Sequence, residues 1–179
     1  MKGNKVSMLN KIKNIVAVLA LVGMTANVMA TTNTNSAPTE AWVLSLSGAG
    51  STVTKGDTGT QFGVDVSLGH TGHLVLPMEA GLRQGVSYDG SSTTIGTTKL
   101  YSDWTLFTVL KTLDVFVGGN VGLAYGNTPV SWTASPEAGA RLWLKRDVAV
   151  LARVEVPFDL NNGKYTDTLR YSLGVAVKF

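Results

Sequence analysis

The 179-residue sequence contains no cysteine, and this absence removes several kinds of protein from consideration. Without a thiol there is no disulfide framework, no thiolate metal site, no cysteine nucleophile and no lipid-modified N-terminal cysteine. Acidic residues are absent from the first 30 residues, which hold four of the 15 Lys and Arg residues. The rest of the chain therefore has 11 basic against 12 acidic residues, so the net charge of +3 gives no argument for nucleic acid as a partner.

Long apolar runs are absent too, because no run reaches the 18 residues typical of a transmembrane helix. The run "IVAVLALVGM" at 15–24 follows a Lys-rich start and precedes small residues at Val28 and Ala30. This pattern predicts a cleaved secretory signal peptide over residues 1–30, with an uncleaved anchor as the alternative. A polar, flexible N-terminal tail at 31–40 and a folded domain at 41–179 are expected to follow.

The folded part is rich in alternation of apolar and polar or small residues. In the last stretch, "YSLGVAVKF", the apolar face holds Tyr171, Leu173, Val175, Val177 and Phe179. Seven earlier stretches from Trp42 onward alternate in the same way, and Gly, Thr and Val are abundant where a helix would favour Ala, Leu and Lys. The sequence therefore predicts eight β-strands.

The stretch at 100–110 alternates less cleanly than the others. Strict period two puts Leu100, Trp104, Leu106 and Leu110 on one face and Tyr101, Asp103, Thr105, Phe107 and Val109 on the other. Three prolines also need an account, because a proline donates no ladder hydrogen bond. Pro136 and Pro157 are expected near strand ends, and Pro77 inside the third strand, with a bulge or local break.

Connections between the stretches alternate in length. Turns such as "GHTGH" at 69–73, "KT" and "KRD" are short, whereas the segments at 50–60, 87–98 and 158–167 are long. Outward aromatic residues are expected in two belts, with Phe62, Tyr88, Tyr125, Trp132 and Tyr171 towards the long loops and Trp42 and Phe179 at the other end. Together these features predict an all-β fold, an eight-stranded antiparallel up-and-down transmembrane β-barrel.

A repeated pentapeptide indicates what fills the barrel. "EAGLR" at 79–83 returns as "EAGAR" at 137–141, and on a strand both charges of each copy share one face. We expect these charges to point into the lumen and to form two pairs across it, Glu79–Arg141 and Arg83–Glu137. The expected lumen charge network also includes Asp65, Asp103, Arg153, Glu155 and Arg170. It is expected to act as a structural plug, with a gate or polar path as the alternative.

The chain from 41 to 179 resembles the small eight-stranded outer-membrane barrels of Gram-negative bacteria, the group of the OmpA transmembrane domain and OmpX. The resemblance rests on the architecture and on the C-terminal strand, where Tyr171, Leu173, Val175, Val177 and Phe179 are similar to the signal read by the outer-membrane assembly machinery. It implies an outer-membrane location, lipid and lipopolysaccharide as surroundings, and a monomer. No periplasmic peptidoglycan-binding domain is expected.

Candidate active and metal sites are weak. His70 and His73 have two ring nitrogens for a metal, but solvated turn residues are the favoured interpretation. "GDTG" and "NNGK" lack calcium-loop spacing and are typical of turns. The catalytic motifs of the lipid A-modifying barrels are not matched, so we expect no enzyme activity, no cofactor and no metal.

Three functions remain in view. The favoured one is a non-enzymatic outer-membrane barrel with a structural or surface-interaction role carried by its loops. The first alternative is a narrow, porin-like pore for ions or small solutes. The second is a soluble secreted barrel of lipocalin type, which requires the Leu and Val faces to point inward and the charged faces outward.

Overall fold

The structure is a computed structural model, and it describes residues 40–53, 60–88, 94–126, 129–161, 163–165 and 168–179. The predicted signal peptide lies outside the described residues, as does the tail apart from Glu40. The strands are β1 (Trp42–Val53), β2 (Thr60–His73), β3 (Pro77–Tyr88), β4 (Thr94–Val109), β5 (Leu113–Gly126), β6 (Ser131–Trp143), β7 (Val148–Glu155), β8 (Phe158–Asp159), β9 (Lys164–Tyr165) and β10 (Thr168–Lys178). Over these described residues there is no helix long and apolar enough to cross a membrane.

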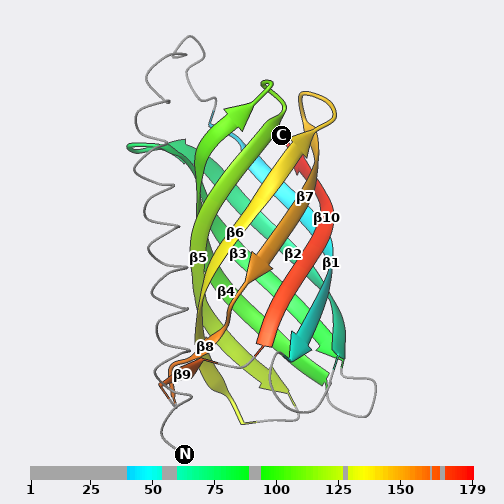
Figure 1. Cartoon of the computed structure of the whole chain (residues 1–179), viewed down its shortest axis with the longest axis vertical. Helices are drawn as coiled ribbons and strands as arrows, with labels where there is room; N and C mark the ends of the chain where they lie inside the picture. Colours follow the sequence, from blue (N-terminus) through cyan, green and yellow to red (C-terminus); the bar gives the residue numbers. More distant parts are fainter. Residues whose placement is uncertain (1–39, 54–59, 89–93, 127–128, 162, 166–167) are drawn as a thin grey trace, which may run out of the picture. The chain divides into compact units, whose positions relative to one another are not determined.

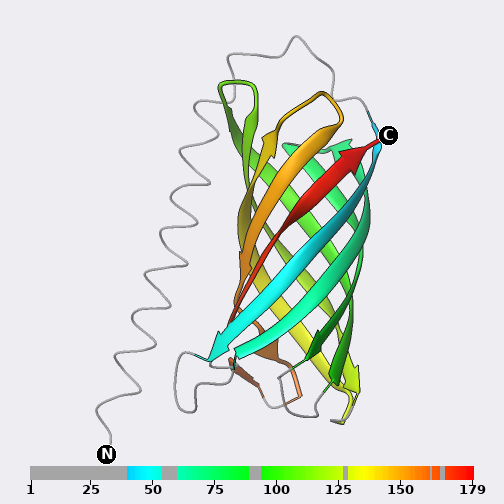
Figure 2. The same ribbon diagram turned by 90° about the vertical axis from the view of Figure 1, so that its right-hand side faces the viewer.

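Eight long strands close into one antiparallel barrel, which confirms the all-β, eight-stranded architecture that the sequence predicts (Figures 1 and 2). Each pairs with its neighbour along the chain from β1 to β7, and β10 pairs with both β7 and β1 to complete the ring. The short β8 and β9 form an added hairpin, and β8 pairs with β6 beyond the last β6–β7 pair. The wall is therefore continuous from β1 round to β10.

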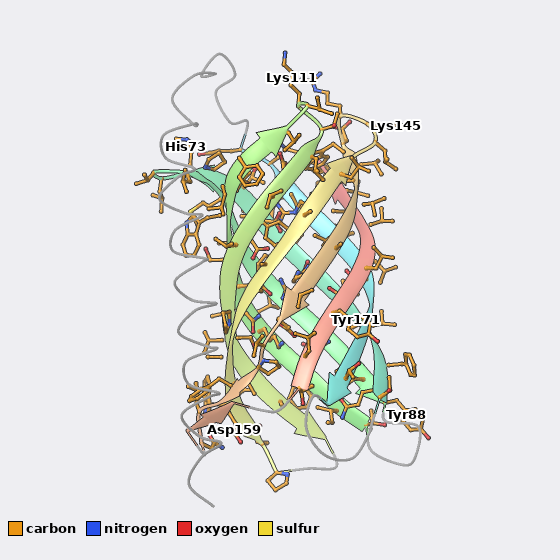
Figure 3. All side chains as sticks on the ribbon, in the orientation of Figure 1. His73, Tyr88, Lys111, Lys145, Asp159 and Tyr171 are labelled. Carbon is orange, nitrogen blue, oxygen red and sulfur yellow. The ribbon has the colours of Figure 1, made fainter. Side chains whose placement is uncertain are left out.

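The two ends of the barrel differ as the connection lengths predict. Lys111 and Lys145 mark the end with the short turns, where the C-terminus also lies (Figure 3). Tyr88 and Asp159 mark the opposite, long-loop end. The strand tilt seen in both ribbon views is the tilt that closes an eight-stranded sheet.

The sidedness of the wall is apolar outside and polar inside. Val64, Val121 and Val175 are 52%, 42% and 47% exposed, whereas Glu137 and Arg153 are 4% and 5% exposed. This arrangement is the reverse of a lipocalin, whose apolar faces line the interior. In water such a surface would be a large apolar patch, which a soluble monomer rarely shows.

A β-bulge corrects the prediction for the fourth stretch. The register of β4 against β5 shifts between Thr105 and Phe107, so one extra residue reverses the alternation from that point. Leu106 is consequently buried at 5% exposure, while Phe107 and Val109 point outward at 39% and 41%. The prediction that Leu106 is outward and Phe107 and Val109 are inward is wrong, because strict period two holds only within an unbroken ladder.

The β2–β3 connection also differs from its prediction. Residues 69–73 are not a turn but the end of β2, and the connection is formed by the apolar residues 74–76. Pro77 pairs with His73 as the first residue of β3, and the ladder from there to Tyr88 has no register shift, so the bulge or break expected at Pro77 is wrong. At the first position of a strand, a missing donor costs little.

The other two prolines lie where the β6–β7 ladder stops. Pro136 is inside β6, next to Glu137, which makes the last pair with β7. Pro157 lies between β7 and β8, and the amide of Val156 donates to Pro136 O at 3.2 Å. The long loops are shorter than expected, because β1, β3 and β4 extend into the segments at 50–60 and 87–98.

Candidate functional site: the charged lumen

Within the described part of the barrel, ten charged residues lie deep on the inward faces of the strands, in addition to the partly exposed Asp114 and Lys178 at the short-turn end. Nine of the ten are at most 6% exposed, and the side chain of Arg170 is 13% exposed. They are five carboxylates and five cations: Asp65, Glu79, Asp103, Glu137 and Glu155, with Arg83, Lys99, Arg141, Arg153 and Arg170. Their formal charges cancel, as a narrow interior of low dielectric requires.

Four of these residues, Arg83, Lys99, Glu137 and Glu155, form a central quartet that is joined by Asn120. Arg83 binds Glu137 through two contacts, Nη1–Oε2 at 2.8 Å and Nη2–Oε1 at 3.2 Å. Lys99 Nζ lies 2.7 Å from Glu155 Oε1. Asn120 Nδ2 donates to Oε2 of both carboxylates, at 3.0 Å to Glu137 and 2.8 Å to Glu155. The bidentate guanidinium pair is the strongest geometry available to such groups.

The quartet is arranged so that like charges are neighbours in the sheet. Arg83 is the direct partner of Lys99 across β3–β4, and Glu137 is the direct partner of Glu155 across β6–β7. Like charges directly opposite on adjacent strands destabilise a sheet. Among the described residues, Arg83 and Lys99 pair only with acids of β6 and β7 across the lumen, whereas Glu155 also pairs with Arg170 on the adjacent β10. Closure of the barrel therefore brings the two cations of β3 and β4 to the two acids of β6 and β7.

A second cluster lies towards the short-turn end, and in it the acids are on β3 and β4 and the cation is on the opposite wall. Here β3 and β4 supply the neighbouring acids Glu79 and Asp103, and β6 supplies Arg141. Arg141 Nη2 lies 3.0 Å from Glu79 Oε2 and 3.3 Å from Asp103 Oδ2. The structure thus brings together both pairs of the repeated pentapeptide across the lumen.

A third cluster lies towards the long loops. Arg170 Nη2 lies 2.5 Å from Asp65 Oδ1, and its Nε lies 3.3 Å from Glu155 Oε1. Arg153 has no ion pair within 4 Å among the described residues, and its Nε has no hydrogen-bond partner there. The space between these side chains has no room for a water molecule.

Aromatic rings pack against the charged side chains of the lumen, and a glycine leaves space for them. The guanidinium of Arg83 lies 4.5 Å from the ring centroid of Tyr101, and the Tyr101 hydroxyl donates to Glu79. The guanidinium of Arg141 lies 4.7 Å from the Phe116 ring. A Cβ on Gly69 would collide with Tyr101 and Glu79, so glycine at this position makes room for both side chains.

The short-turn end of the lumen is apolar. Val43, Ala149 and Ala176 form a buried cluster with Trp143 packed against it. Leu106, Phe116 and Leu151 are likewise at most 5% exposed. Trp143 Nε1 donates to Asp114 Oδ2 at 2.6 Å, which satisfies the one polar atom of its ring. The lumen is therefore charged at its centre and closed by apolar side chains at this end.

Sequence reasoning missed three contributors to the network. Lys99 falls between the predicted loop at 87–98 and the stretch at 100–110, so the sequence assigns it no face, although it stands two residues before Tyr101 and shares its face once β4 is extended. Tyr101 lies on the predicted inner face but has no predicted partner, and the sequence predicts no role for Asn120. An alternation count continued through "TTKLYSD" would have found Lys99.

The remaining candidate residues lie on the outside or at the ends. His70 is exposed and packs edge-on against Trp42, with ring centroids 5.0 Å apart, and the described residues hold no group of three or more potential metal ligands. Tyr171, Leu173, Val175 and Val177 are 40–64% exposed on the outer face of β10, and Phe179 is 68% exposed. The ring of Tyr171, labelled in Figure 3, lies over Gly50 of β1, where a Cβ would collide with it.

Comparison of the whole fold with solved structures identifies its type. The crystal structure of neisserial surface protein A matches with a TM-score of 0.57 and 13% identity, covering 78% of this chain and 97% of that one. The N-terminal β-barrel domain of Pseudomonas aeruginosa OprF matches with a TM-score of 0.55 and 15% identity, covering 76% and 97%. The chain has the fold of the small OmpA- and OmpX-like barrels. No protein-family model and no curated protein matches the sequence.

Proposed function

We propose that this chain is a non-enzymatic outer-membrane β-barrel with a structural or surface-interaction role, whose lumen is closed by its charge network. The observation that carries the proposal is the sidedness of the wall: apolar side chains cover the outside, while five carboxylates and five cations are held inside. In a bilayer every backbone group must be satisfied within the protein, and a closed barrel achieves this. The fold shared with neisserial surface protein A and with the N-terminal domain of OprF supports the proposed outer-membrane location.

The lumen network also suits a brace better than a channel. Ion pairs connect walls that are distant in the sheet, such as β3 with β6 and β4 with β7, and the Arg170–Glu155 pair joins the adjacent β10 and β7. An eight-stranded barrel is only wide enough for its own side chains, and here apolar residues occupy the short-turn end as well. Recognition of other molecules is then left to the surface loops.

The test is reconstitution of the full chain from denaturant into phospholipid vesicles. The expected result is a folded barrel that resists protease, shows β-sheet circular dichroism and migrates differently on gels before and after boiling. A chain that stays soluble and monomeric without lipid or detergent would overturn the membrane location and favour the secreted alternative.

A narrow pore is the second candidate, and one contact favours it. Arg83 Nη1 lies 2.8 Å from Glu137 Oε2 but also 3.9 Å from Glu155 Oε2, so a small rotation exchanges its partner. Single-channel conductance in planar bilayers separates the two candidates. A pore should conduct, and its conductance should change in Arg83→Ala and Arg141→Ala but not in Arg146→Ala, at an exposed turn. A closed brace should give no channel events in any of them.

The C-terminal strand is proposed as the segment that the outer-membrane assembly machinery reads. Its apolar residues form an unbroken outward face that ends in the exposed ring of Phe179. Deletion of Phe179 should lower the amount of assembled barrel in cells while leaving folding into vesicles intact. Equal assembly of the two forms in cells would remove this role.

A further inference from the structure

A groove of about 640 Å³ lies on the outer wall of the barrel, over β4, β5 and β6. Leu100, Trp104 and Val121 form its sides, and all three are more than a third exposed. Phe158 of the added β8–β9 hairpin forms part of its lining. The groove lies near the middle of β4 and β5, at the depth of the hydrocarbon if the barrel spans a membrane.

A row of small side chains explains why the wall is hollow there. Ala80, Ser102, Gly119 and Pro136 are successive partners across β3, β4, β5 and β6, so they lie side by side at one level. Of these, Ser102, Gly119 and Pro136 line the groove. A Cβ at Gly119 would have only ordinary contact with Ser135 O, at 3.5 Å, so glycine is not required there by the protein's own neighbours.

A polar cluster lies on the same wall, next to the groove and towards the long loops. Thr98 Oγ1 donates to Gln84 Oε1 at 2.6 Å, and Gln84 Nε2 donates to the hydroxyl of Tyr125 at 2.5 Å. Thr98 stands two residues before Leu100 on β4, so one step along the strand, about 6.6 Å, separates it from the groove. The cluster contains hydrogen-bonding groups and no charge.

We propose that this wall binds one diacyl phospholipid, with an acyl chain in the groove and the ester carbonyls at the Gln84–Thr98–Tyr125 cluster. The inference rests on the proposed membrane location. An empty groove against lipid would forfeit dispersion contacts, and an acyl chain is the apolar matter already present there. The cluster has amide and hydroxyl groups that match esters, and no cation that would bind the phosphates of lipopolysaccharide.

A second copy of the barrel is the competing occupant, and the site favours lipid over it. Lipid tails are as apolar as leucine, so no hydrophobic force drives two barrels together in a bilayer. A partner barrel would also have to bury the polar cluster, whereas the ester region of a lipid gives that cluster further hydrogen-bond partners.

The experiment reconstitutes the full chain in nanodiscs of palmitoyl-oleoyl phosphatidylethanolamine, extracts it into mild detergent, and counts bound phospholipid by native mass spectrometry. The wild type should retain one phospholipid. Gly119→Phe fills the groove and should lower the fraction that retains it by about tenfold, which corresponds to about 1.4 kcal/mol. Gln84→Leu, which removes the centre of the polar cluster, should lower it several-fold.

Gly48→Phe is the matched control. Like Gly119, Gly48 is an outward glycine with space for a Cβ, and it is exposed on β1, away from the groove. It should retain phospholipid like the wild type, and Ala134→Leu, a smaller obstruction in the groove, should repeat the effect of Gly119→Phe if that variant folds poorly. Gel migration before and after boiling reports folding of every sample.

Three outcomes would overturn the site. They are a folded wild type without bound phospholipid, equal retention in both glycine variants, and a wild-type dimer that Gly119→Phe dissociates, which would assign the groove to a second copy. A chain that never enters the nanodisc would instead refute the membrane location, so the two failures are distinguishable.

Discussion

Replacement of Arg83 by methionine tests whether the lumen network stabilises the barrel. The guanidinium is 3% exposed and makes two contacts with Glu137, at 2.8 and 3.2 Å. Methionine keeps much of the aliphatic volume but removes the charge. The ten-residue network would then hold five carboxylates against four cations. Glu137 would lose both guanidinium contacts and keep the Asn120 amide, while its neighbour Glu155 still repels it.

The expected loss of stability follows from the Glu137 carboxylate, which remains buried without its cation. Removal of one partner of a buried ion pair leaves an uncompensated charge and costs about 3–5 kcal/mol. The cation–π contact with Tyr101 adds about 1 kcal/mol or less to the loss. We therefore expect Arg83→Met to lower the free energy of unfolding by about 4 kcal/mol.

A double mutant separates the charge from the side chain. Glu137→Gln removes the negative charge and keeps an oxygen for Asn120, so Arg83→Met with Glu137→Gln should cost at least about 2 kcal/mol less than the sum of the single variants. Arg146→Met is the matched control, because it removes the same side chain from an exposed turn and should change stability by less than about 0.5 kcal/mol.

The assay is equilibrium urea unfolding of the barrel in vesicles, followed by tryptophan fluorescence and by gel migration before boiling. Reversibility must be shown from both directions, since irreversible unfolding reports a rate rather than a free energy. An Arg83→Met barrel as stable as the Arg146→Met barrel would refute the reasoning, as would a strictly additive double mutant.

Two further predictions concern the backbone. Leu106→Ala should lower the unfolding free energy by about 3 kcal/mol and Phe107→Ala by clearly less, because the bulge buries Leu106 and exposes Phe107. Urea unfolding measures both losses, and the reverse order would place the bulge elsewhere. Leu110 and Lys111, with φ of 51° and 62°, are the two central residues of the β4–β5 turn, which the Thr112 amide closes by donating to Val109 O at 3.1 Å. Since such turns favour Asn-Gly, the pair Leu110→Asn and Lys111→Gly should raise the unfolding free energy by about 1 kcal/mol, and an unchanged or lower urea midpoint would contradict the turn geometry.

The strand count and the direction of most side chains follow from period two. The alternation at 171–179 and the repeated Glu-to-Arg spacing at 79–83 and 137–141 fix which residues share a face. The structure places those faces as the pattern predicts. The same local rule fails at Leu106, where an inserted residue reverses the faces, because a bulge is a property of two paired strands.

Turn positions were harder to predict than strands. The Gly and Thr residues of "GHTGH" resemble a turn, yet they lie in β2, and the apolar residues 74–76 make the connection. The ladder between β2 and β3 continues to the His73–Pro77 pair, so pairing decides where the hairpin turns. Local preference is weaker than the hydrogen bonds of a continuous ladder.

The sequence by itself determined which residues share a face, because successive side chains of a strand point to opposite sides. It also determined which end carries the short turns. The structure decided that the charged faces are inside and the apolar faces outside. Only the tertiary structure decided that Lys99 pairs with Glu155, that Asn120 joins two carboxylates, and that small residues of four strands line up beneath one groove. How these residues face one another depends on the stagger between strands when the ring closes.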